Sequence, residues 1–348
     1  MKILFFVNKS ISSATARFRG YQISKELKKT YTTKVIRIDE IYNRYYVDKK
    51  RIKNFFNYLR IIKNTKKNDV LYLVKTVYNI DFLILIIFFK LLYNKKIVFD
   101  FDDTIYLKPF LKSSTKLLTH FSDAVIVGSN TLLKWAKIRN QNCFKIPTSV
   151  PHLIYKKKRL RKNKIFTIGW IGNGTNHYKN LKILKNVFEQ LIEKKIIFKF
   201  KLIGLADNKD ILRLFNSIKK LNFTYKNHID WKNFKSSVNE IKKFDVGIMP
   251  LVNDEKTRGK CSFKIIEYMA AGVPVIASSV GENTIVIKNN VNGMLATSQN
   301  EWINKIIFLK KNNRLKKKMV KNALINVEKS YSNISCSKKL QIILKKIF

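Results

Sequence analysis

The chain has 348 residues, 46% of them hydrophobic, which excludes global disorder and suits two domains of roughly 150 residues each rather than one core. Its three scattered cysteines form neither a CxxC pair nor a Cys/His cluster, so they indicate neither a disulfide framework nor a zinc site and favour a reducing cytoplasm. The formal net charge of +47 reflects either the codon bias of an AT-rich genome or attraction to a polyanion, such as an anionic membrane surface or nucleic acid.

The most apolar segments do not predict a signal peptide or a membrane span. The run MKILFFVNKS at the start is short and is typical of a first strand. FLILIIFFKLLY, residues 82–93, has twelve residues, whereas a spanning helix needs about twenty. We therefore expect a buried helix at 82–93.

Short apolar runs alternate with helical patterns along the first 150 residues or so. This alternation predicts a parallel sheet covered by helices on both faces. Helices are expected at 15–28 and 82–93. The predicted strands are 3–7, 33–38, 70–74, 96–101 and 124–129.

A basic, proline-containing stretch between Thr148 and Lys164 interrupts the pattern and predicts a linker. The alternation then restarts, with two or three more helices from Glu301 onward. The further elements expected are strands at 166–172, 198–204, 227–231, 245–251 and 273–278, and helices near 178–193, 208–220, 236–242 and 263–271.

These elements predict an α/β fold with two doubly wound, Rossmann-like halves. We expect an N-terminal domain at 1–155, a C-terminal domain at 165–328, and a final helix at 329–348 that packs back on the N-terminal domain. Ligands of such sheets bind beyond the carboxyl ends of the strands. The natural site is then the cleft between the two halves.

The segment GKCSFKIIEYMAAGVPVIAS, residues 259–278, places cations where a helix should begin. Ser262 is expected to cap a helix that ends before Gly272, whose left-handed conformation would close it. Lys260, Lys264 and the preceding Arg258 would then lie at the positive pole of that helix. An anion that completes the charge balance would explain them.

Two interpretations of these charges remain open. Lys264 and Glu267 can form a surface ion pair, but Lys before Glu opposes the helix dipole, and such pairs contribute only about 0.2–0.5 kcal/mol. Alternatively, the helix start holds a phosphate, and Glu267, one turn later, accepts hydrogen bonds from a ribose. The second interpretation predicts a nucleotide or sugar-phosphate site.

This segment resembles the donor site of the GT-B retaining glycosyltransferases, a large family (glycosyl transferases group 1, or family 4-like) that includes glycogen and sucrose synthases. FTIGWIGNGTNHYKNL, DVGIMPL and NGMLA follow the order and spacing of the family's C-terminal domain. The resemblance is strong over 165–297. It is looser before that, through SSATARFRGYQI, VFDFDDTIY and DAVIVGSNTLLKWAK. It implies the GT-B fold, with two Rossmann-like domains facing across a cleft.

The resemblance also implies a donor site. Glu267 matches the second glutamate of the family's E-x7-E motif, which binds the donor ribose, and Lys264 falls beside the diphosphate. Gly259 replaces the first glutamate, which leaves its contact with the transferring sugar open to Lys260 or a neighbour, and SSATARFR replaces the usual N-terminal Gly-Gly loop. The other donor-binding residues expected are Arg258, Ser262, Gly172, Asn173, Gly174, Thr175 and Lys179.

Carboxylates follow the predicted strand 96–101. Adjacent carboxylates repel, so one is expected to have a raised pKa. In the families that this chain resembles, a polar residue at the end of this strand lies near the reacting sugar carbon. The resemblance therefore makes Asp102 and Asp103, with Lys264, the candidate catalytic groups; the alternative for the two acids is structural capping. The string DFDD also contains D-x-D, which binds manganese in a different glycosyltransferase fold, but two Rossmann-like halves argue against that, and no metal or other cofactor is expected.

Arginines and a histidine near two predicted helix starts are weaker candidates. Arg17 and Arg19 are expected to contact a phosphate or an acidic acceptor, or else to lie at a solvated helix start. His177 is expected at the surface. Residues 44–67 interleave aromatic with basic residues and predict an amphipathic helix that either lies in a membrane interface or packs on the core.

Three functions fit this sequence. The first is a retaining glycosyltransferase that moves a sugar from a UDP- or GDP-sugar to a glycan or lipid-linked acceptor in cell-envelope polysaccharide synthesis. It would act in the cytoplasm or at the inner face of the cell membrane. The second is a polyanion binder, although no RRM, KH, OB or helix-turn-helix signature indicates a specific nucleic acid. The third is a GT-B-fold epimerase or phosphorylase.

Overall fold

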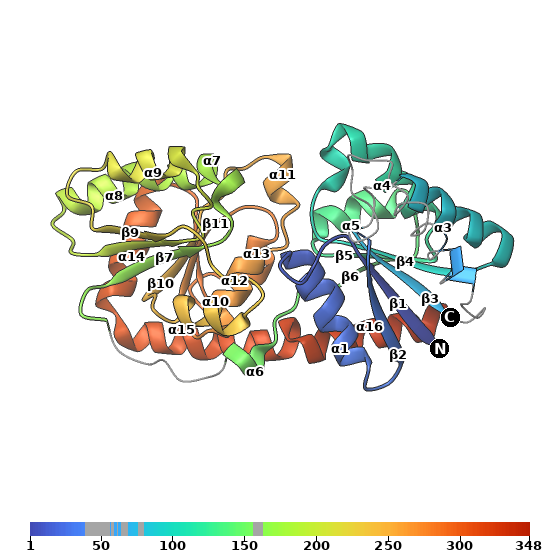
Figure 1. The fold of residues 1–348 in the computed structure, drawn as a ribbon. Helices are drawn as coiled ribbons and strands as arrows, with labels where there is room; N and C mark the ends of the chain where they lie inside the picture. Colours follow the sequence, from blue (N-terminus) through green and yellow to red (C-terminus); the bar gives the residue numbers. More distant parts are fainter. Residues whose placement is uncertain (39–55, 57–58, 61, 64–68, 76–79, 156–162) are drawn as a thin grey trace. The chain divides into compact units, whose positions relative to one another are not determined.

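The computed structural model describes residues 1–38, 56, 59–60, 62–63, 69–75, 80–155 and 163–348 (Figure 1). It divides the chain into two compact units. The first unit comprises Met1–Ser149, Gly259–Cys261 and Asn333–Phe348. The second unit comprises Val150–Arg258 and Ser262–Ser332. Each has its own sheet and is described by itself.

The first unit is built on a parallel sheet of six strands in the order β2-β1-β3-β4-β5-β6. Its inner strands are buried on both faces, which is why they appear in the sequence as continuous apolar runs. The strand order reverses between β1 and β3, so loops after these strands diverge at that point. The strands are β1 Lys2–Val7, β2 Thr32–Arg37, β3 Val70–Val74, β4 Lys96–Phe101, β5 Ala124–Val127 and β6 Cys143–Lys145.

Helices cover both faces of this sheet. One core cluster contains residues of α3, α4 and α5, and the other contains residues of η1, α1 and the C-terminal α16. The helix expected at 15–28 is divided into a π-helical turn, η1, and a regular helix, α1. The bounds are η1 Ala16–Tyr21, α1 Gln22–Leu27, α3 Ile80–Tyr93, η2 Ile105–Leu107, α4 Pro109–Phe121, α5 Asn130–Lys137 and α16 Asn333–Ile347.

The apolar helix α3 is less buried than its sequence predicts. Phe82 and Ile86 lie in the core, but Ile84, Phe88 and Leu91 are exposed. The expectation of a buried helix is therefore wrong for half of its surface. A helix that is apolar all round gives no periodicity from which to tell its inner face from its outer one.

The second unit repeats the design with a parallel sheet in the order β12-β11-β10-β7-β8-β9. The order reverses between β7 and β10. The strand predicted at 227–231 is wrong: the chain forms β9 just before it, where Phe223 pairs with Phe200 of β8. The bounds are β7 Thr167–Ile171, β8 Lys199–Ile203, β9 Phe223–Lys226, β10 Val246–Met249, β11 Val275–Ser278 and β12 Met294–Ala296.

Two core clusters lie on the faces of this second sheet, one with α7, α8, α9 and α14 and the other with α6, α10, α12 and α13. The tail contributes the helices expected after Glu301. The bounds are α6 His152–Tyr155, η3 Gly174–Asn176, α7 Tyr178–Lys182, α8 Leu184–Glu193, α9 Lys209–Asn216, α10 Phe234–Ile241, α11 Glu255–Arg258, α12 Phe263–Ala270, α13 Asn283–Val286, α14 Gln299–Lys311, α15 Asn313–Asn326 and η4 Val327–Tyr331.

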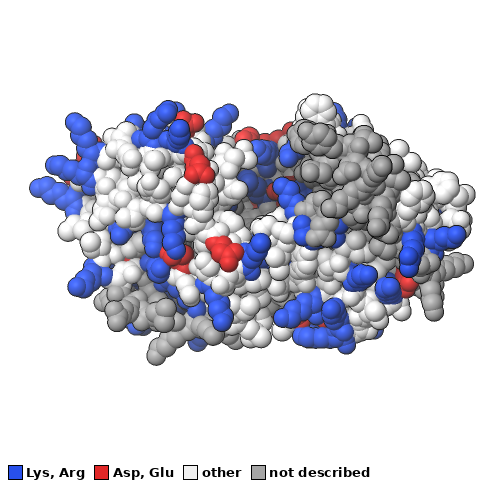
Figure 2. All heavy atoms as spheres, in the orientation of Figure 1, with Lys and Arg blue, Asp and Glu red and all other residues white. Residues whose placement is uncertain are grey.

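Basic side chains are scattered over the visible face of each unit, with few acidic ones among them (Figure 2). Of the helices in the described ranges, none is long and apolar enough to cross a membrane. The amphipathic helix predicted at 44–67 falls almost entirely outside the described residues.

Candidate active site

Helix α12 begins and ends close to where the sequence predicts. Gly272 has φ +69°, and the backbone N–H of Val273 donates to the carbonyl of Tyr268 at 2.9 Å, so the predicted left-handed ending is confirmed. The predicted cap is wrong. Ser262 has φ +55°, not the extended conformation of a capping residue, and its hydroxyl donates to Asn283 Oδ1 at 2.7 Å.

Lys264, in the first turn of α12, lies against the loop that follows β7. A Cβ atom on Gly172 would come within 2.4 Å of Lys264 Cε and 3.0 Å of its Nζ. The same ammonium lies 5.2 Å from the ring centroid of Trp170. The structure thus brings Lys264 and the GNGT loop together, at the point where the strand order of the second sheet reverses.

Close backbone contacts hold the GNGT loop, residues 172–175. A Cβ on Gly204, which has φ +85°, would lie 2.1 Å from the carbonyl oxygen of Gly172. Gly174 donates its N–H to the carbonyl of Gly204 at 2.8 Å. Asn173 Oδ1 accepts from the backbone and the hydroxyl of Thr175 at 3.0 and 2.6 Å. Only glycine at position 204 permits this close approach to the carbonyl oxygen of Gly172.

Glu267 lies one turn beyond Lys264 and is only 8% exposed. Tyr155, the last residue of α6, donates its hydroxyl to Glu267 Oε1 at 2.8 Å. Glu267 therefore does not lie at the surface, where the ion-pair interpretation placed it. Sequence reasoning did not identify Tyr155, which lies 112 residues away in the chain and in no motif.

The remaining predicted residues of the second unit, Lys179, His177 and Arg258, differ in burial. Lys179 and Arg258 are exposed, and Arg258 Nε donates to Asn253 Oδ1 at 2.7 Å. His177, expected at the surface, is buried, and its ring packs edge-on against Trp170 at 5.2 Å. His177 is buried because its ring packs against Trp170, which is itself 1% exposed.

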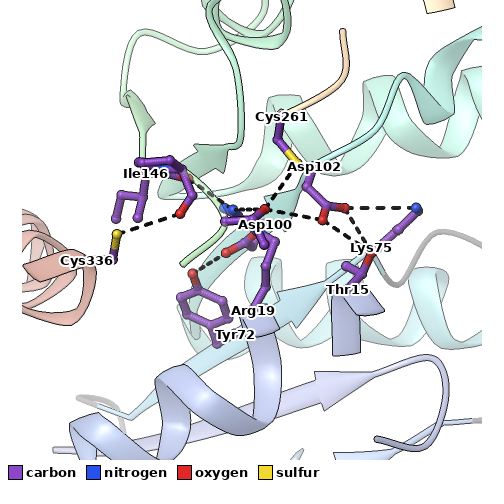
Figure 3. A network of polar contacts seen from close by, with 11 residues as sticks. Thr15, Arg19, Tyr72, Lys75, Asp100, Asp102, Ile146, Cys261 and Cys336 are labelled. Carbon is purple, nitrogen blue, oxygen red and sulfur yellow. Dashed lines mark hydrogen bonds and ion pairs between the residues drawn. The ribbon is translucent and has the colours of Figure 1, made fainter. Parts of the chain in front are cut away.

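A separate polar cluster lies in the first unit, beyond the carboxyl ends of β3 and β4 (Figure 3). Thr15 donates its hydroxyl to Asp102 Oδ1 at 3.0 Å. Lys75, the residue after β3, forms an ion pair with Asp103, and its ammonium lies 4.0 Å from Asp102 Oδ1. Sequence reasoning missed Lys75, although a lysine directly after a buried strand is itself a signal of the carboxyl edge.

The two neighbouring acids of this cluster titrate in opposite directions. Burial, with the charge of Asp103, raises the pKa of Asp102. The ammonium of Lys75 lowers the pKa of Asp103 to about 2. The expectation that one acid of the pair has a raised pKa therefore holds for Asp102. At neutral pH Asp103 is an ion-pair partner, and Asp102 is the acid better suited to hold or exchange a proton.

The arginines of η1 are internal. Arg19 forms a buried ion pair with Asp100 and donates to the carbonyl of Ile146 at 3.0 Å. Arg17 is also buried and donates to the carbonyl of Ile11 at 3.0 Å. Neither lies at a solvated helix start. In this structure Arg19 holds β4 through Asp100, and Arg17 bonds to the loop after β1.

Gly259–Cys261 is part of the first unit. Ser129 Oγ donates to the carbonyl of Gly259 at 3.0 Å, and a Cβ on Gly259 would lie 2.1 Å from Thr104 Cγ2. No acid can replace this glycine without displacing Thr104. Lys260, the next residue, is close enough for its charge to contribute to the low pKa of Asp103. In the part of the chain that the structure describes, no group of three or more His, Cys, Asp or Glu side chains could hold a metal ion.

Known proteins resemble this chain in sequence and in fold. A family model described as Glycosyl transferases group 1 matches residues 165–312. No curated protein is similar enough in sequence to match. A glycosyltransferase from Rickettsia africae is 18% identical, with 99% of this chain and 98% of that one covered and a TM-score of 0.75.

Two further solved structures are similar over their whole length. HepE of Anabaena, solved with UDP and glucose, is 16% identical with a TM-score of 0.71, covering 99% of each chain. Sucrose-phosphate synthase from Thermosynechococcus elongatus is 12% identical with a TM-score of 0.73, covering 100% of this chain and 99% of that one. At these identities the likeness concerns the fold, which is GT-B.

Proposed function

We propose that this chain, whose residues 165–312 belong to the family Glycosyl transferases group 1, transfers a sugar from a nucleoside-diphosphate sugar to an acceptor. The observation that carries the proposal is the contact of Lys264 with the GNGT loop at Gly172, with Glu267 one turn further along α12. A cation, a helix N-terminus and a buried carboxylate then lie in the order in which diphosphate and ribose follow each other in the donor.

The proposed mechanism in the second unit is electrostatic. As the glycosidic bond to the diphosphate breaks, negative charge grows on the leaving phosphate. Lys264 and the backbone N–H groups at the start of α12 would stabilise that charge without having to reorganise. Glu267 would orient the nucleotide through its ribose. We propose retention of configuration and no metal requirement for this step.

The proposed donor is a UDP-sugar. Support comes from HepE, solved with UDP and glucose, and from the pneumococcal O-GlcNAc transferase GtfA, solved with UDP and GlcNAc. GtfA is 15% identical with a TM-score of 0.61, and the match covers 87% of this chain and 61% of that one. A GDP-sugar is the alternative donor, and the release experiment below distinguishes the two.

The proposed acceptor is a glycan or lipid-linked sugar of cell-envelope polysaccharide synthesis. In the first unit, Asp102 would accept a hydrogen bond from an acceptor hydroxyl, with Lys75 and Thr15 fixing its position. We further propose that the enzyme acts at the inner face of the cell membrane. The support is the net charge of +47 and the apolar Phe110 of α4, 89% exposed beside exposed Lys108 and Lys112.

Release of nucleoside diphosphate tests the function. Purified protein is incubated separately with UDP- and GDP-sugars, and free UDP or GDP is measured with and without a lipid-linked acceptor extract. Release of UDP with sugar transfer supports the proposal, and epimerised sugar nucleotide would indicate an epimerase instead. The proposal fails if no sugar nucleotide binds or turns over, or if one binds and Glu267→Ala leaves its affinity unchanged.

Membrane association is tested separately. Vesicles containing anionic phospholipid should carry the protein in flotation at low salt and release it at high salt, because exposed charge pairs are screened. Neutral vesicles serve as the control. Equal flotation with both kinds of vesicle would contradict an electrostatic attachment.

A further inference from the structure

A buried hydrogen bond joins α6 to the carboxylate that we assign to the donor ribose. Tyr155 is 1% exposed, and its hydroxyl donates to Glu267 Oε1 at 2.8 Å. A buried phenol and a buried carboxylate each lose their contact with water, so each needs a partner. A hydrogen bond to an ionised acceptor is also among the stronger kinds. The bond therefore restricts where the Glu267 carboxylate lies.

Tyr155, which donates this hydrogen bond, is itself held in place by the backbone around α6. Val150 donates its N–H to the carbonyl of Tyr331 at 2.9 Å and pairs with Ser332 in a parallel bridge. The first turn of α6 follows directly, with the N–H of His152 bonded to the carbonyl of Val150 at 2.8 Å. The ring of Tyr155 then packs in the core cluster that includes α12. A packed ring with two torsions holds its hydroxyl in one place.

We infer that Tyr155 is a positioning residue for the donor ribose, which it controls by holding Oε1 of Glu267. The inference rests on the proposed function and deepens it, because it names the residue that sets discrimination between ribose and deoxyribose. A site that hydrogen-bonds a ligand hydroxyl rejects the analogue that lacks it, provided that the partner is held in place. Without Tyr155 the carboxylate can turn about its side-chain torsions, and that discrimination falls.

The test compares dissociation constants for UDP, 2′-deoxy-UDP and 3′-deoxy-UDP by titration calorimetry, with the guanine series in parallel. Wild-type protein should prefer the ribonucleotide. The ribose ratio is the dissociation constant of a deoxy analogue divided by that of UDP. In Tyr155→Phe this ratio should fall about tenfold for at least one deoxy analogue, while the affinity for that analogue itself changes by no more than about twofold. A general loss of structure would weaken all ligands together and leave the ratio unchanged.

Tyr268→Phe is the matched control. Tyr268 is buried on α12, the helix that also carries Glu267. Its hydroxyl oxygen accepts from the N–H of Ile171 at 3.1 Å and donates to the carbonyl of Ile248 at 3.4 Å. Its loss should lower the melting temperature and keep the ribose ratio. An equal fall in both variants would overturn the inference.

Other outcomes separate the inference from the function. If wild-type protein prefers UDP to its deoxy analogues and Tyr155→Phe keeps that preference, the inference is overturned and the proposed function stands. If wild-type protein binds neither UDP nor GDP, both are overturned. Should Tyr155→Phe fail to fold, a ring-fluorinated tyrosine at this position, a stronger donor of equal shape, should raise the ratio, and an unchanged ratio would overturn the inference.

Discussion

Lys75 pairs with Asp103, while its ammonium lies 4.0 Å from Asp102. One cation therefore acts on two neighbouring acids, and the nearer one is held ionised with a pKa of about 2. Lys75 follows β3 and the acids follow β4. The pair thus connects the ends of two adjacent strands at the edge where ligands of such sheets bind.

Lys75→Met should destabilise the protein at neutral pH and not in strong acid. Lys75 lowers the folded-state pKa of Asp103, so its contribution is complete above about pH 4, where the unfolded carboxyl is ionised, and is lost as the pH falls through about 2. Asp103 is 50% exposed, so solvent screening limits the difference in unfolding free energy to about 1 kcal/mol. Urea unfolding at pH 6 and pH 2 measures it. Lys75→Arg, which keeps the charge, is the control, and a difference that persists at pH 2 would show that Lys75 acts through packing.

Lys264→Ala should weaken the binding of UDP by roughly tenfold to a hundredfold, because a charge-assisted contact of about 1.5–3 kcal/mol is removed. Calorimetric titration measures this effect. Lys316 is the matched control, because its ammonium also lies over an aromatic ring, 5.9 Å from the Phe166 centroid. Lys316→Ala should leave the affinity unchanged. Equal losses in both variants would mean that general positive charge, rather than Lys264, attracts the nucleotide.

Gly172→Ala should reduce nucleotide affinity far more than stability. The added methyl meets the flexible end of Lys264, which can move aside, but that movement takes the ammonium away from its place over Trp170. Gly272→Ala is the opposite case: its φ of +69° is unfavourable for alanine, while the added Cβ would lie 3.7 Å from Val320 Cγ1, an ordinary contact. It should cost about 1 kcal/mol of unfolding free energy and leave affinity unchanged. Thermal melting and calorimetry on both variants check the contrast, which fails if their effects are alike.

Arg19→Met should destabilise the protein by about 3–5 kcal/mol, because it leaves the Asp100 carboxylate buried without its cation. Adding Asp100→Asn should recover much of that loss, since an amide carries no buried charge and can still accept from Tyr72. Urea unfolding of the single and double variants measures the recovery. If the two substitutions add their costs, the pair does not act as a unit.

The sequence predicts the strands best where burial is complete. β3 and β4 begin and end at the predicted residues, because strands covered on both faces are continuous apolar runs with sharp ends. The strand predicted at 227–231 lies too late in the chain compared with β9. Phe223 and Tyr225 of β9 alternate with polar residues at the edge of the sheet, so the hydrophobic signal there is weak. Short strands such as β6 carry too few residues to be predicted.

The site was predictable only where it is local in sequence. Lys264, Glu267 and the GNGT loop follow from motifs, but Tyr155 reaches Glu267 across 112 residues, and no pattern in the chain marks that contact. The burial of Arg19 depends on Asp100 and Ile146, which lie on other elements. Ser262 illustrates a third limit, since the sequence identifies a capping residue type but not its backbone angles.

The first unit is assembled from three separate stretches of chain, and this constrains any attempt to build chimaeras. Leu340 and Leu344 of α16 belong to the same core cluster as Phe5 of β1, although they come from opposite ends of the polypeptide. A fragment that stops at Ser149 would expose that cluster and also lack Gly259–Cys261. Exchanging the second unit with that of a relative therefore requires joins at 149/150, 258/259, 261/262 and 332/333, and a simple two-part fusion would give an incomplete recipient.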